Sequence, residues 1–439
     1  MASLSFTHLL AMMIDDGQVI GYPLKSKYTI QGWCHITMDK LSRLNELLQY
    51  AKENNAFYES LYQGLEMPVS DTRNIPILHR RDIRKNKYGI ISKPYTLEGL
   101  MHDKTNGTTE KIPLDIYRTE YEWIKSNMDL WKKRRSVSKR HSSKYAFYYY
   151  NGNDHSLSHK NFSNGNYKAF HFPMMKQGVC QFANDLYMMK KENIKWVIAP
   201  PSILFTLACV ALQHEIDIEI PIIESISEYL PHQYISLFEK VFRSKVYDNY
   251  GCHEVWGIAY SDSNGELRVM ENVIVEELVD DRFLNGFKRC IVTNLTVKSM
   301  PFIRYELSDL IKVNGDVLQT YGFRWNEYVQ LDNTNIHCSV FMNIFENFDA
   351  IRLLPLENYQ LIYKEDGIVL ILMNVEKYLH NYIREHLERN LAEIYRKTIS
   401  VSVLASKRFL VDTVSGKMRG IVNYYDVNVN EEFNLGMEY

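Results

Sequence analysis

The sequence predicts an α/β fold, with a large N-terminal domain of α/β sheets and a β-rich subdomain, followed by a small C-terminal α+β domain. Between residues 106 and 250, polar stretches with helical periodicity alternate with short apolar strands, which is typical of an α/β sheet. Residues 266–313 are rich in branched and aromatic residues, which favour strands. At 439 residues the chain exceeds the size that one hydrophobic core supports, so we expect two domains, over 1–324 and 325–439.

The N-terminal half predicts mainly helices and buried strands. Leu and aromatic residues recur at helical spacing over Met38 to Tyr62, which predicts one or two helices. The run from Trp196 to Leu212 is apolar, but Pro200-Pro201 divides it into pieces too short to cross a bilayer, so we expect a buried strand, a turn and a buried helix. The tract from Tyr145 to Tyr167 predicts a surface loop, because its aromatic residues give way to Asn, Gly and Ser. The remaining elements are helices over Glu120–Lys132 and Met174–Glu192 and strands over Trp196–Ala199, Ile220–Ile223 and Lys245–Tyr247.

The C-terminal half predicts mostly strands, because its segments are short and rich in β-branched residues. In the β-rich region we expect strands over Val273–Leu278, Cys290–Leu295 and Pro301–Leu307. After residue 324 the expected elements are strands over Tyr359–Tyr363 and Ile368–Met373, a helix over Val375–Lys397 and a strand over Ile399–Leu404. This ββαβ order suits a small separate α+β domain.

The charge balance argues against a general nucleic-acid binder. Lys and Arg together number 51 and Asp and Glu number 53, whereas such a protein normally carries a basic surplus. We interpret the basic run from Lys132 to Arg135 as a solvated helix end. The 6 cysteines form no CxxC pair, and the N-terminus has no signal-peptide pattern, so we expect a cytoplasmic protein with reduced thiols and no membrane span, as a monomer or a homodimer.

A first candidate segment for chemistry runs from Lys104 to Lys111 and is rich in hydroxyl donors. Gly107 lets the backbone approach a ligand closely, and Lys111 adds positive charge, a combination suited to the β- and γ-phosphates of a nucleotide. The spacing is not that of a Walker loop, and a solvated Thr-rich turn is the alternative. The candidate phosphate-binding residues are Thr105, Asn106, Gly107, Thr108, Thr109 and Lys111.

A second segment, Tyr250-Gly251-Cys252-His253-Glu254, lies where a predicted strand ends, which is where α/β sheets usually bind ligands. Glu254 is a candidate ligand of Mg²⁺ bound to a triphosphate, because this hard cation prefers carboxylate oxygens. A surface charge is the alternative for a lone Glu. Zinc is disfavoured because Cys252 and His253 have no matching second pair.

Two further segments supply a carboxylate and a lysine. Asp309 follows a β-type run and offers two oxygens at the separation of two ribose hydroxyls. Arg304 is either part of this site or a structural ion-pair partner. Lys417, in Ser415-Gly416-Lys417, is suited to stabilise charge on an α-phosphate and a substrate carboxylate during in-line attack. A carboxylate is a poor electrophile, so acyl transfer needs an activated leaving group such as AMP.

Together these segments resemble the adenylate-forming ligase superfamily, and residues 245–310 are most similar to its phenylacetate-CoA ligase and CapK-like branch, which includes deazaflavin-coenzyme adenylating synthetases. The resemblance covers residues 40–425 approximately and implies a large ATP- and acid-binding domain with a mobile C-terminal lid. It implies a phosphate loop over Thr105–Lys111 and an adenine border from Ser225 to Glu228, with Ser225, Ile226, Ser227, Tyr250 and Gly251 among the ATP-binding residues. It also implies Mg²⁺ at Glu254, ribose at Asp309, ribose or phosphate at Arg324, and Lys417 as the adenylation lysine.

The sequence also departs from the family pattern. Glu110 stands where these enzymes usually have Gly, His253 where Thr is common, and Ser308 where Gly precedes the ribose-binding Asp. An acidic residue in a phosphate loop is electrostatically unfavourable for ATP. The Asp-Asp pair usual at the hinge is Asn326-Glu327 here, which leaves the pivot residue open.

The predicted function is ATP-dependent activation of a small carboxylic acid, with aromatic acids among the candidates, as an acyl-adenylate. Pyrophosphate is released, and the acyl group passes to a thiol, of coenzyme A or a carrier protein, or to an amine. The catalytic candidates are Lys417, Glu254 and His253, and the cofactors are ATP and Mg²⁺, with coenzyme A as a candidate co-substrate. Two alternatives remain at this point: a coenzyme adenylyltransferase and a non-catalytic nucleotide-binding relative.

Overall fold

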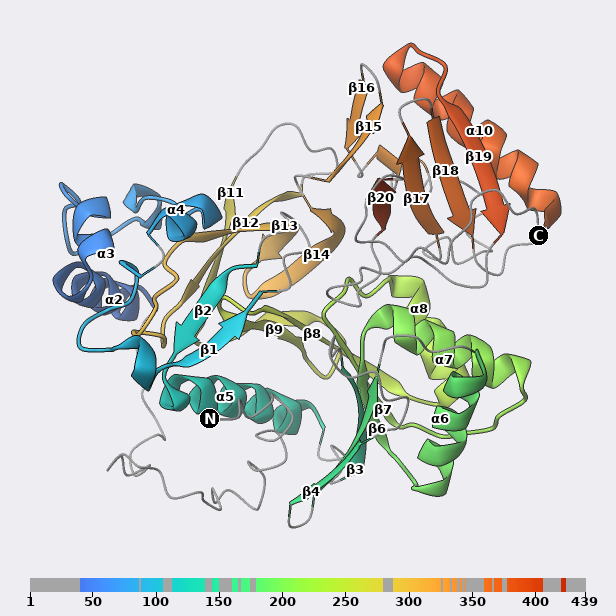
Figure 1. The fold of residues 1–439 in the computed structure, drawn as a ribbon, viewed down its shortest axis with the longest axis horizontal. Coiled ribbons are helices and arrows are strands. Elements are labelled where there is room, and N and C mark those ends of the chain that lie inside the picture. Colours follow the sequence, from blue (N-terminus) through green and yellow to red (C-terminus); the bar gives the residue numbers. More distant parts are fainter. Residues whose placement is uncertain are drawn as a thin grey trace.

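The structure, a computed structural model, describes most of the chain from residue 40 onward. The described residues are 40–86, 88–105, 113–138, 144–149, 160–164, 167–173, 179–278, 287–324, 327–331, 334–337, 340–341, 344, 359–364, 367–372, 377–405 and 420–423. They form a 12-stranded sheet, a separate 4-stranded sheet and two 2-stranded sheets (Figure 1). The α/β class predicted from the sequence is confirmed.

One half of the 12-stranded sheet is mainly parallel, and its strand over Trp196–Ala199 is buried on both faces. Its strands are β4 (Lys160–Asn164), β5 (Tyr167–Pro173), β3 (Lys144–Tyr149), β6 (Trp196–Ala199), β7 (Ile222–Ile226) and β8 (Lys245–Cys252), in that order. Along β6, Trp196 and Ile198 join the core that includes α5 (Glu120–Val137). Val197 and Ala199 join the opposite core, with α6 (Val179–Lys191), α7 (Pro201–Gln213) and α8 (His232–Phe242), which lie together in Figure 1. Burial on both faces explains why β6 is a continuous apolar run.

The other half of the sheet is antiparallel and carries the N-terminal helices. After β8 the strand order is β9 (Trp256–Ser261), β10 (Leu267–Val269), β14 (Val317–Arg324), β13 (Tyr305–Asn314), β12 (Lys288–Asn294) and β11 (Val273–Leu278). Helices α2 (Lys40–Asn54) and α3 (Ala56–Leu61) bury their apolar residues against this half, in one core with β12 and β13. The same region holds the short helices η1 (Thr72–Asn74), α4 (Arg80–Lys85) and η2 (Leu97–Gly99), and the ribbon of β1 (Met101–Lys104) and β2 (Asp115–Arg118).

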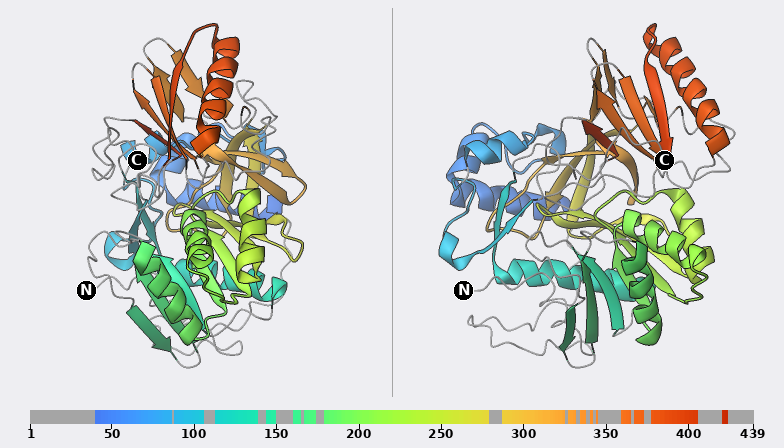
Figure 2. Two further views of the ribbon diagram at one scale, coloured as in Figure 1. Left: turned by 90° about the vertical axis from the view of Figure 1, so that its right-hand side faces the viewer. Right: turned by 45° about the vertical axis from the view of Figure 1, so that its right-hand side comes forward.

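The C-terminal part forms its own sheet, in the order β19 (Ser400–Ala405), β18 (Gly367–Leu372), β17 (Tyr359–Lys364) and β20 (Ile421–Asn423), with α10 (Lys377–Tyr395) beside it (Figure 2). The ribbon of β15 (Tyr328–Leu331) and β16 (Thr334–His337) lies between this sheet and β14 in the chain. The expected ββαβ order is confirmed. Leu310 and Tyr321, from the large sheet, belong to the same buried cluster as this C-terminal part. The domain division at residues 324 and 325 stays a prediction.

Several expected elements differ from the structure in extent or kind. The N-terminal helical region forms two helices, and the strand, turn and helix over residues 196–212 are confirmed as β6 and α7. The strand expected over Pro301–Leu307 was misplaced, because β13 begins only at Tyr305 and the preceding apolar residues are buried without strand pairing. The surface loop expected over Tyr145–Tyr167 is also wrong in its described part, which contains β3 and β4.

The basic run at the end of α5 is not uniformly solvated. Arg134 is 2% exposed, and its Nε and Nη2 donate to the two carboxylate oxygens of Glu224 on β7, at 2.9 and 2.5 Å. Its guanidinium also lies over the rings of Trp131 and Trp196. The interpretation of this run as a solvated helix end was therefore wrong for Arg134. A bidentate partner and two aromatic faces compensate the cost of burying this charge.

No helix in the described ranges is both long and apolar enough to span a membrane.

Candidate nucleotide and acid site

The first group of site residues joins β8 to the hairpin of β13 and β14. The hydroxyl of Tyr250 donates to Asp309 Oδ2 at 2.7 Å, and Arg324 Nε donates to Asp309 Oδ1 at 3.4 Å. Asp309 and Arg324 are also paired across the hairpin, next to a register shift in β13. The sheet curls enough to bring β8 to β13, although β9, β10 and β14 separate them in strand order. Tyr250, Asp309 and Arg324 are thus brought together as the sequence analysis requires.

Electrostatics hold this first group in a defined protonation state. Burial and the adjacent Asp309 carboxylate raise the pKa of Tyr250 well above its ordinary value, so its hydroxyl stays a donor. Burial acts to lower the pKa of Arg324, but the charges of Asp309 and Glu327 outweigh it and the net shift is upward. Glu327 also accepts the backbone N–H of Arg324 at 3.0 Å, which ties this carboxylate to the end of β14.

The second group surrounds Glu254. This side chain is 7% exposed, and its Oε1 accepts from Arg80 Nη1 and from the hydroxyl of Tyr305, both at 3.1 Å. Arg80 Nη2 donates to Thr105 Oγ1 at 2.8 Å, and that oxygen also accepts the backbone N–H of Leu114 at 2.8 Å. Glu254, at the turn after β8, is therefore linked by one arginine to the first residue of the candidate phosphate loop.

A third group contains His253. Its Nδ1 lies 2.8 Å from Asp103 Oδ2 on β1, and its backbone carbonyl accepts a hydrogen bond from Arg118 at the end of β2. Burial acts to raise the pKa of Asp103, but the hydrogen bond and charge of His253 outweigh it, so the pKa lies below its usual value. The Arg118 guanidinium is 5.3 Å from the centre of the Trp256 ring, and its Nε and Nη1 make no hydrogen bond with the described residues.

Cys252 connects the first two groups. Burial raises the pKa of its thiol most, followed by the charge of Glu254 and, to a smaller extent, that of Asp309; together they outweigh backbone hydrogen bonds that lower the pKa, and they keep the thiol neutral. In the chain, Cys252 lies between Tyr250 of the first group and Glu254 of the second. The nearby Cys290 is likewise held neutral by burial and by Asp309. Neither thiol has the exposed, electropositive surroundings of a nucleophilic cysteine.

Tight backbone geometry sets the direction of these side chains. A Cβ on Gly251 would lie 2.4 Å from the carbonyl oxygen of Trp256, so only glycine fits where β8 turns into β9. Trp256 itself has a φ of 68° and Ser227 a φ of 70°, in the left-handed region that bulky residues avoid. Such backbone strain is common where a site requires a particular orientation.

The segment expected to border adenine begins inside β7, with Ser225 and Ile226. Ser225 is fully buried, and its hydroxyl donates to Asp248 Oδ1 at 3.0 Å, so its side chain points into the sheet rather than to the Asp309 group. Ile226 is half-buried at the end of β7. Farther along, Tyr229 packs on Gly322 of β14, where a Cβ would lie 2.9 Å from its ring. The structure thus places this segment against the strand that carries Arg324.

Other candidates lie outside the described residues. These are Asn106, Gly107, Thr108, Thr109, Glu110, Lys111, Asn326 and Lys417. Their roles stay predictions.

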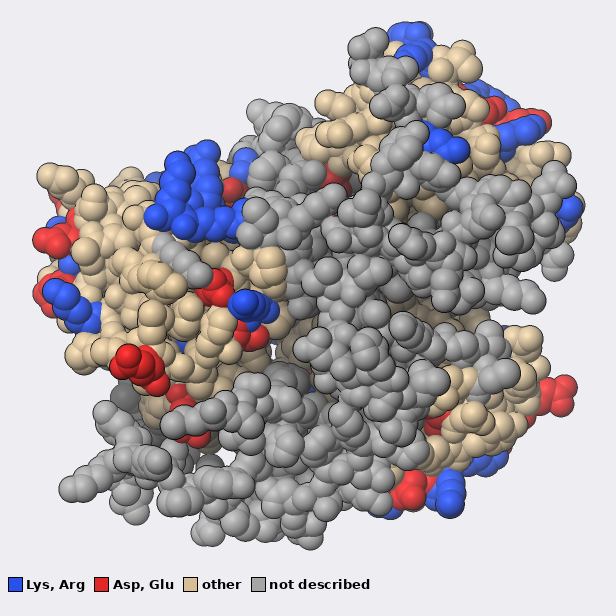
Figure 3. Space-filling model, in the orientation of Figure 1, with Lys and Arg blue, Asp and Glu red and all other residues tan. Residues whose placement is uncertain are grey.

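Sequence reasoning missed the residues that support the site. Arg80 lies in Arg80-Arg81-Asp82-Ile83-Arg84-Lys85, which has the composition of an exposed helix, and Figure 3 shows basic side chains gathered over this element. Its contact with Glu254 spans 174 residues. The one feature of the sequence that could have indicated an inward-facing Arg80 was its position shortly after an apolar run, Ile75 to Leu78. Arg304, by contrast, is a structural ion-pair partner, with Nε 3.1 Å from Glu276 Oε2.

The chemistry of the Glu254 group fits a magnesium ion that arrives with a nucleotide. Both hydrogen bonds that described residues make to Glu254 end on Oε1, which leaves Oε2 as an acceptor. Mg²⁺ is commonly held by one or two carboxylates together with substrate phosphates. The described residues contain no cluster of three or more His, Cys, Asp or Glu that could hold a metal by themselves.

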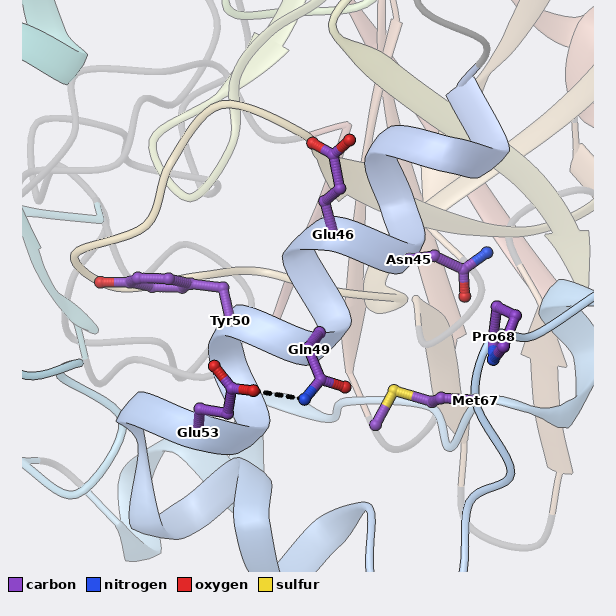
Figure 4. A pocket seen from close by; sticks show the side chains of 7 residues that line it. All are labelled: Asn45, Glu46, Gln49, Tyr50, Glu53, Met67 and Pro68. Carbon is purple, nitrogen blue, oxygen red and sulfur yellow. Dashed lines mark hydrogen bonds between the residues drawn. The ribbon is translucent and has the colours of Figure 1, made fainter.

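A surface pocket of about 490 Å³ lies elsewhere, along α2 (Figure 4). Its lining consists of Asn45, Glu46, Gln49, Tyr50, Glu53, Met67 and Pro68. None of the predicted site residues lines it, and we assign it no part in the chemistry.

The sequence matches no protein-family model and no curated protein. Among solved structures, 2-hydroxyisobutyryl-CoA ligase in the postadenylation state, in complex with R3-HIB-AMP, aligns with a TM-score of 0.63 at 14% sequence identity, covering 88% of this chain and 89% of that chain. This chain has the fold of that ligase. The same ligase aligns with a TM-score of 0.62 in complex with 2-HIB-AMP, and of 0.53 in an open conformation with 2-HIB-AMP and CoA, where 87% of this chain and 90% of that chain are covered.

Proposed function

We propose that this protein is an AMP-forming carboxylate ligase, which activates a small carboxylic acid with ATP and transfers the acyl group to a thiol or an amine. The observation that carries the proposal is the convergence of Tyr250, Asp309 and Arg324, with Glu254 at the turn that follows the strand of Tyr250, on the fold of a ligase solved with an acyl-adenylate. The motifs over residues 245–310 favour the phenylacetate-CoA ligase and CapK-like branch. Among the described residues, Cys209, Cys252 and Cys290 are thiols and not disulfides, which supports a cytoplasmic protein.

In the first half-reaction, a carboxylate oxygen of the acid attacks the α-phosphorus of ATP and pyrophosphate leaves. Asp309 would accept the ribose hydroxyls, and Tyr250 and Arg324 fix its two oxygens for that purpose. Thr105, followed by Asn106 to Lys111, would bind the outer phosphates. Glu254 would hold Mg²⁺, which would neutralise phosphate charge, with His253 beside it as a second catalytic candidate.

Charge from the C-terminal part would complete the adenylation site. Lys417 would stabilise the negative charge that develops between the α-phosphate and the substrate carboxylate. In the second half-reaction, the acceptor's sulfur or nitrogen attacks the acyl carbonyl and AMP leaves. Coenzyme A, a carrier-protein thiol and a free amine remain candidate acceptors.

The deciding experiment measures pyrophosphate release with Mg-ATP across aromatic, aliphatic and amino acids, without an acceptor, for the native protein and Lys417→Ala. We expect release that depends on one class of acid and that falls by orders of magnitude in the variant. ATP binding without release for every acid would favour a non-catalytic nucleotide-binding protein. Accumulation of an adenylated coenzyme would favour a coenzyme adenylyltransferase instead.

A further inference from the structure

Arg80 makes two contacts that no other described residue combines. Its Nη1 lies 3.1 Å from Glu254 Oε1, and its Nη2 lies 2.8 Å from Thr105 Oγ1. Glu254 is the proposed metal ligand and Thr105 the first residue of the proposed phosphate loop. One planar guanidinium therefore spans both, with a fixed distance between its two nitrogens.

The two residues that precede Arg80 are held against β13. Leu78 forms a parallel bridge with Tyr305, through hydrogen bonds to Arg304 and Glu306 of 3.0 Å each. His79, which begins α4, places its Nδ1 2.7 Å from Glu306 Oε2. Since Tyr305 also donates to Glu254, the strand that holds Arg80 in place is the strand that supplies the second donor to the same carboxylate.

These contacts determine which oxygen of Glu254 is available. Arg80 and Tyr305 both bind Oε1, so the carboxylate cannot rotate without losing two hydrogen bonds, and Oε2 is directed elsewhere. Glu254 is nearly buried, and a buried carboxylate without a partner is costly, so Arg80 also balances its charge before any cation binds.

We propose that Arg80 is a positioning residue for nucleotide and magnesium binding, which orients Glu254 and anchors the start of the phosphate loop at Thr105. This inference rests on the proposed function of the site. Residues that orient a metal-binding carboxylate typically affect metal affinity or activity by about 10- to 100-fold.

The test compares Arg80→Ala and Arg80→Lys with Arg81→Ala. Arg81 is the matched control, because it is the next residue of α4, its side chain is 74% exposed, and its ion-pair distance to Asp82 is a loose 3.8 Å. ATP binding is measured by calorimetry at a series of Mg²⁺ concentrations, and pyrophosphate release is measured on the same samples. Thermal unfolding establishes that each variant is folded.

We expect Arg80→Ala to raise the Mg²⁺ concentration for half-maximal ATP binding by about tenfold or more and to lower kcat. Arg80→Lys should recover part of the loss, because an ammonium can reach Glu254 or Thr105 but cannot bridge both in one plane. Arg81→Ala should match the native protein. A native Mg²⁺ dependence in folded Arg80→Ala, or in folded Arg80→Lys if the alanine variant does not fold, would overturn the inference.

The binding and release measurements separate the two proposals. If the native protein binds Mg-ATP but releases no pyrophosphate with any acid, the proposed function fails while the calorimetry still decides the role of Arg80. If release is normal and the Arg80 variants behave like Arg81→Ala, only the inference about Arg80 fails. If the native protein binds no ATP at any Mg²⁺ concentration, both are wrong.

Discussion

At the scale of single residues, the candidate site depends on hydrogen bonds that hold carboxylates in one orientation. Asp309 is held by Tyr250 and Arg324, and Glu254 by Arg80 and Tyr305. In each pair a carboxylate is bound by one arginine and one tyrosine hydroxyl. The tyrosines cannot ionise under ordinary conditions, because burial raises the pKa of both well above the usual value.

Removing one of these hydroxyls should weaken nucleotide binding without unfolding the protein. We expect Tyr250→Phe to bind ATP several-fold more weakly. A hydrogen bond to a charged group contributes about 1.5–3 kcal/mol, but Arg324 still holds the other oxygen of Asp309 in the variant, so the carboxylate loses only part of its orientation. Calorimetry measures the change. Tyr247→Phe is the control, since Tyr247 is on the same strand and its hydroxyl donates to the Val137 carbonyl, at 3.5 Å, instead of to Asp309. Equal affinities for native protein and Tyr250→Phe would contradict the prediction.

A second residue-scale prediction concerns Asp248, which lies on β8 just before Tyr250. Burial raises its pKa to about 7, opposed by the Ser225 hydrogen bond and the Asn249 backbone N–H. The folded protein therefore keeps a proton that the unfolded chain loses near pH 4. The stabilisation is fully present below that value and is lost as pH rises through about 7.

Asp248→Asn should flatten this pH dependence, because the amide keeps the oxygen that accepts from Ser225 and cannot ionise. We expect the fall in the free energy of unfolding between pH 5 and pH 8, measured in urea, to be smaller in the variant. A residual fall should remain, because burial also raises the pKa of Asp185, to about 6. Asp217→Asn, at an exposed ion pair, is the control. An unchanged slope in Asp248→Asn would show that Asp248 does not titrate as stated.

At the scale of elements, Gly322 of β14 allows the ring of Tyr229, which follows the adenine-border segment, to pack closely on this strand. A Cβ at Gly322 would lie 2.9 Å from the Tyr229 ring, so Gly322→Ala should displace Tyr229 and shift the chain between β7 and α8. We expect a cost of about 1–3 kcal/mol in stability and weaker ATP binding. Gly257→Ala, on β9, is the control, because its Cβ would meet Met270 at an ordinary 3.7 Å. If the two variants bind ATP equally well, Tyr229 does not shape the site.

The same elements show what a sequence can and cannot reveal. β6 and β11 were predicted with their observed bounds, because short apolar runs between polar segments leave little choice. Tyr250, Asp309 and Arg324 were predictable because each belongs to a short local motif that the family resemblance identifies. Arg80 and the burial of Arg134 were not, since each depends on a partner far along the chain that local composition does not identify. The strand at Pro301–Leu307 was misplaced because buried coil and buried strand share the same apolar composition.

At the scale of the whole molecule, β13 connects two cores at the position of the candidate site. Leu310 belongs to the buried cluster shared with the C-terminal part, whereas Ile311 belongs to the large core that contains α2. Both side chains are 0% exposed, and successive residues of a strand point to opposite faces. Asp309 directly precedes them, so the packing of the C-terminal part and the position of the proposed ribose ligand are coupled through one strand.

This coupling predicts different outcomes for substitutions at neighbouring positions. Leu310→Ala and Ile311→Ala should each cost about 2–5 kcal/mol, because each leaves a cavity in a packed core. Hydrogen exchange should nevertheless distinguish them: Leu310→Ala should raise exchange in β17 and β18, and Ile311→Ala in α2. Local opening follows the loss of buried contacts in the same cooperative unit, so the affected peptides report which core each side chain supports. If Leu310→Ala left exchange in β17 and β18 unchanged while raising it in α2, Leu310 would belong to the large core. The C-terminal part would then be free to move without disturbing Asp309.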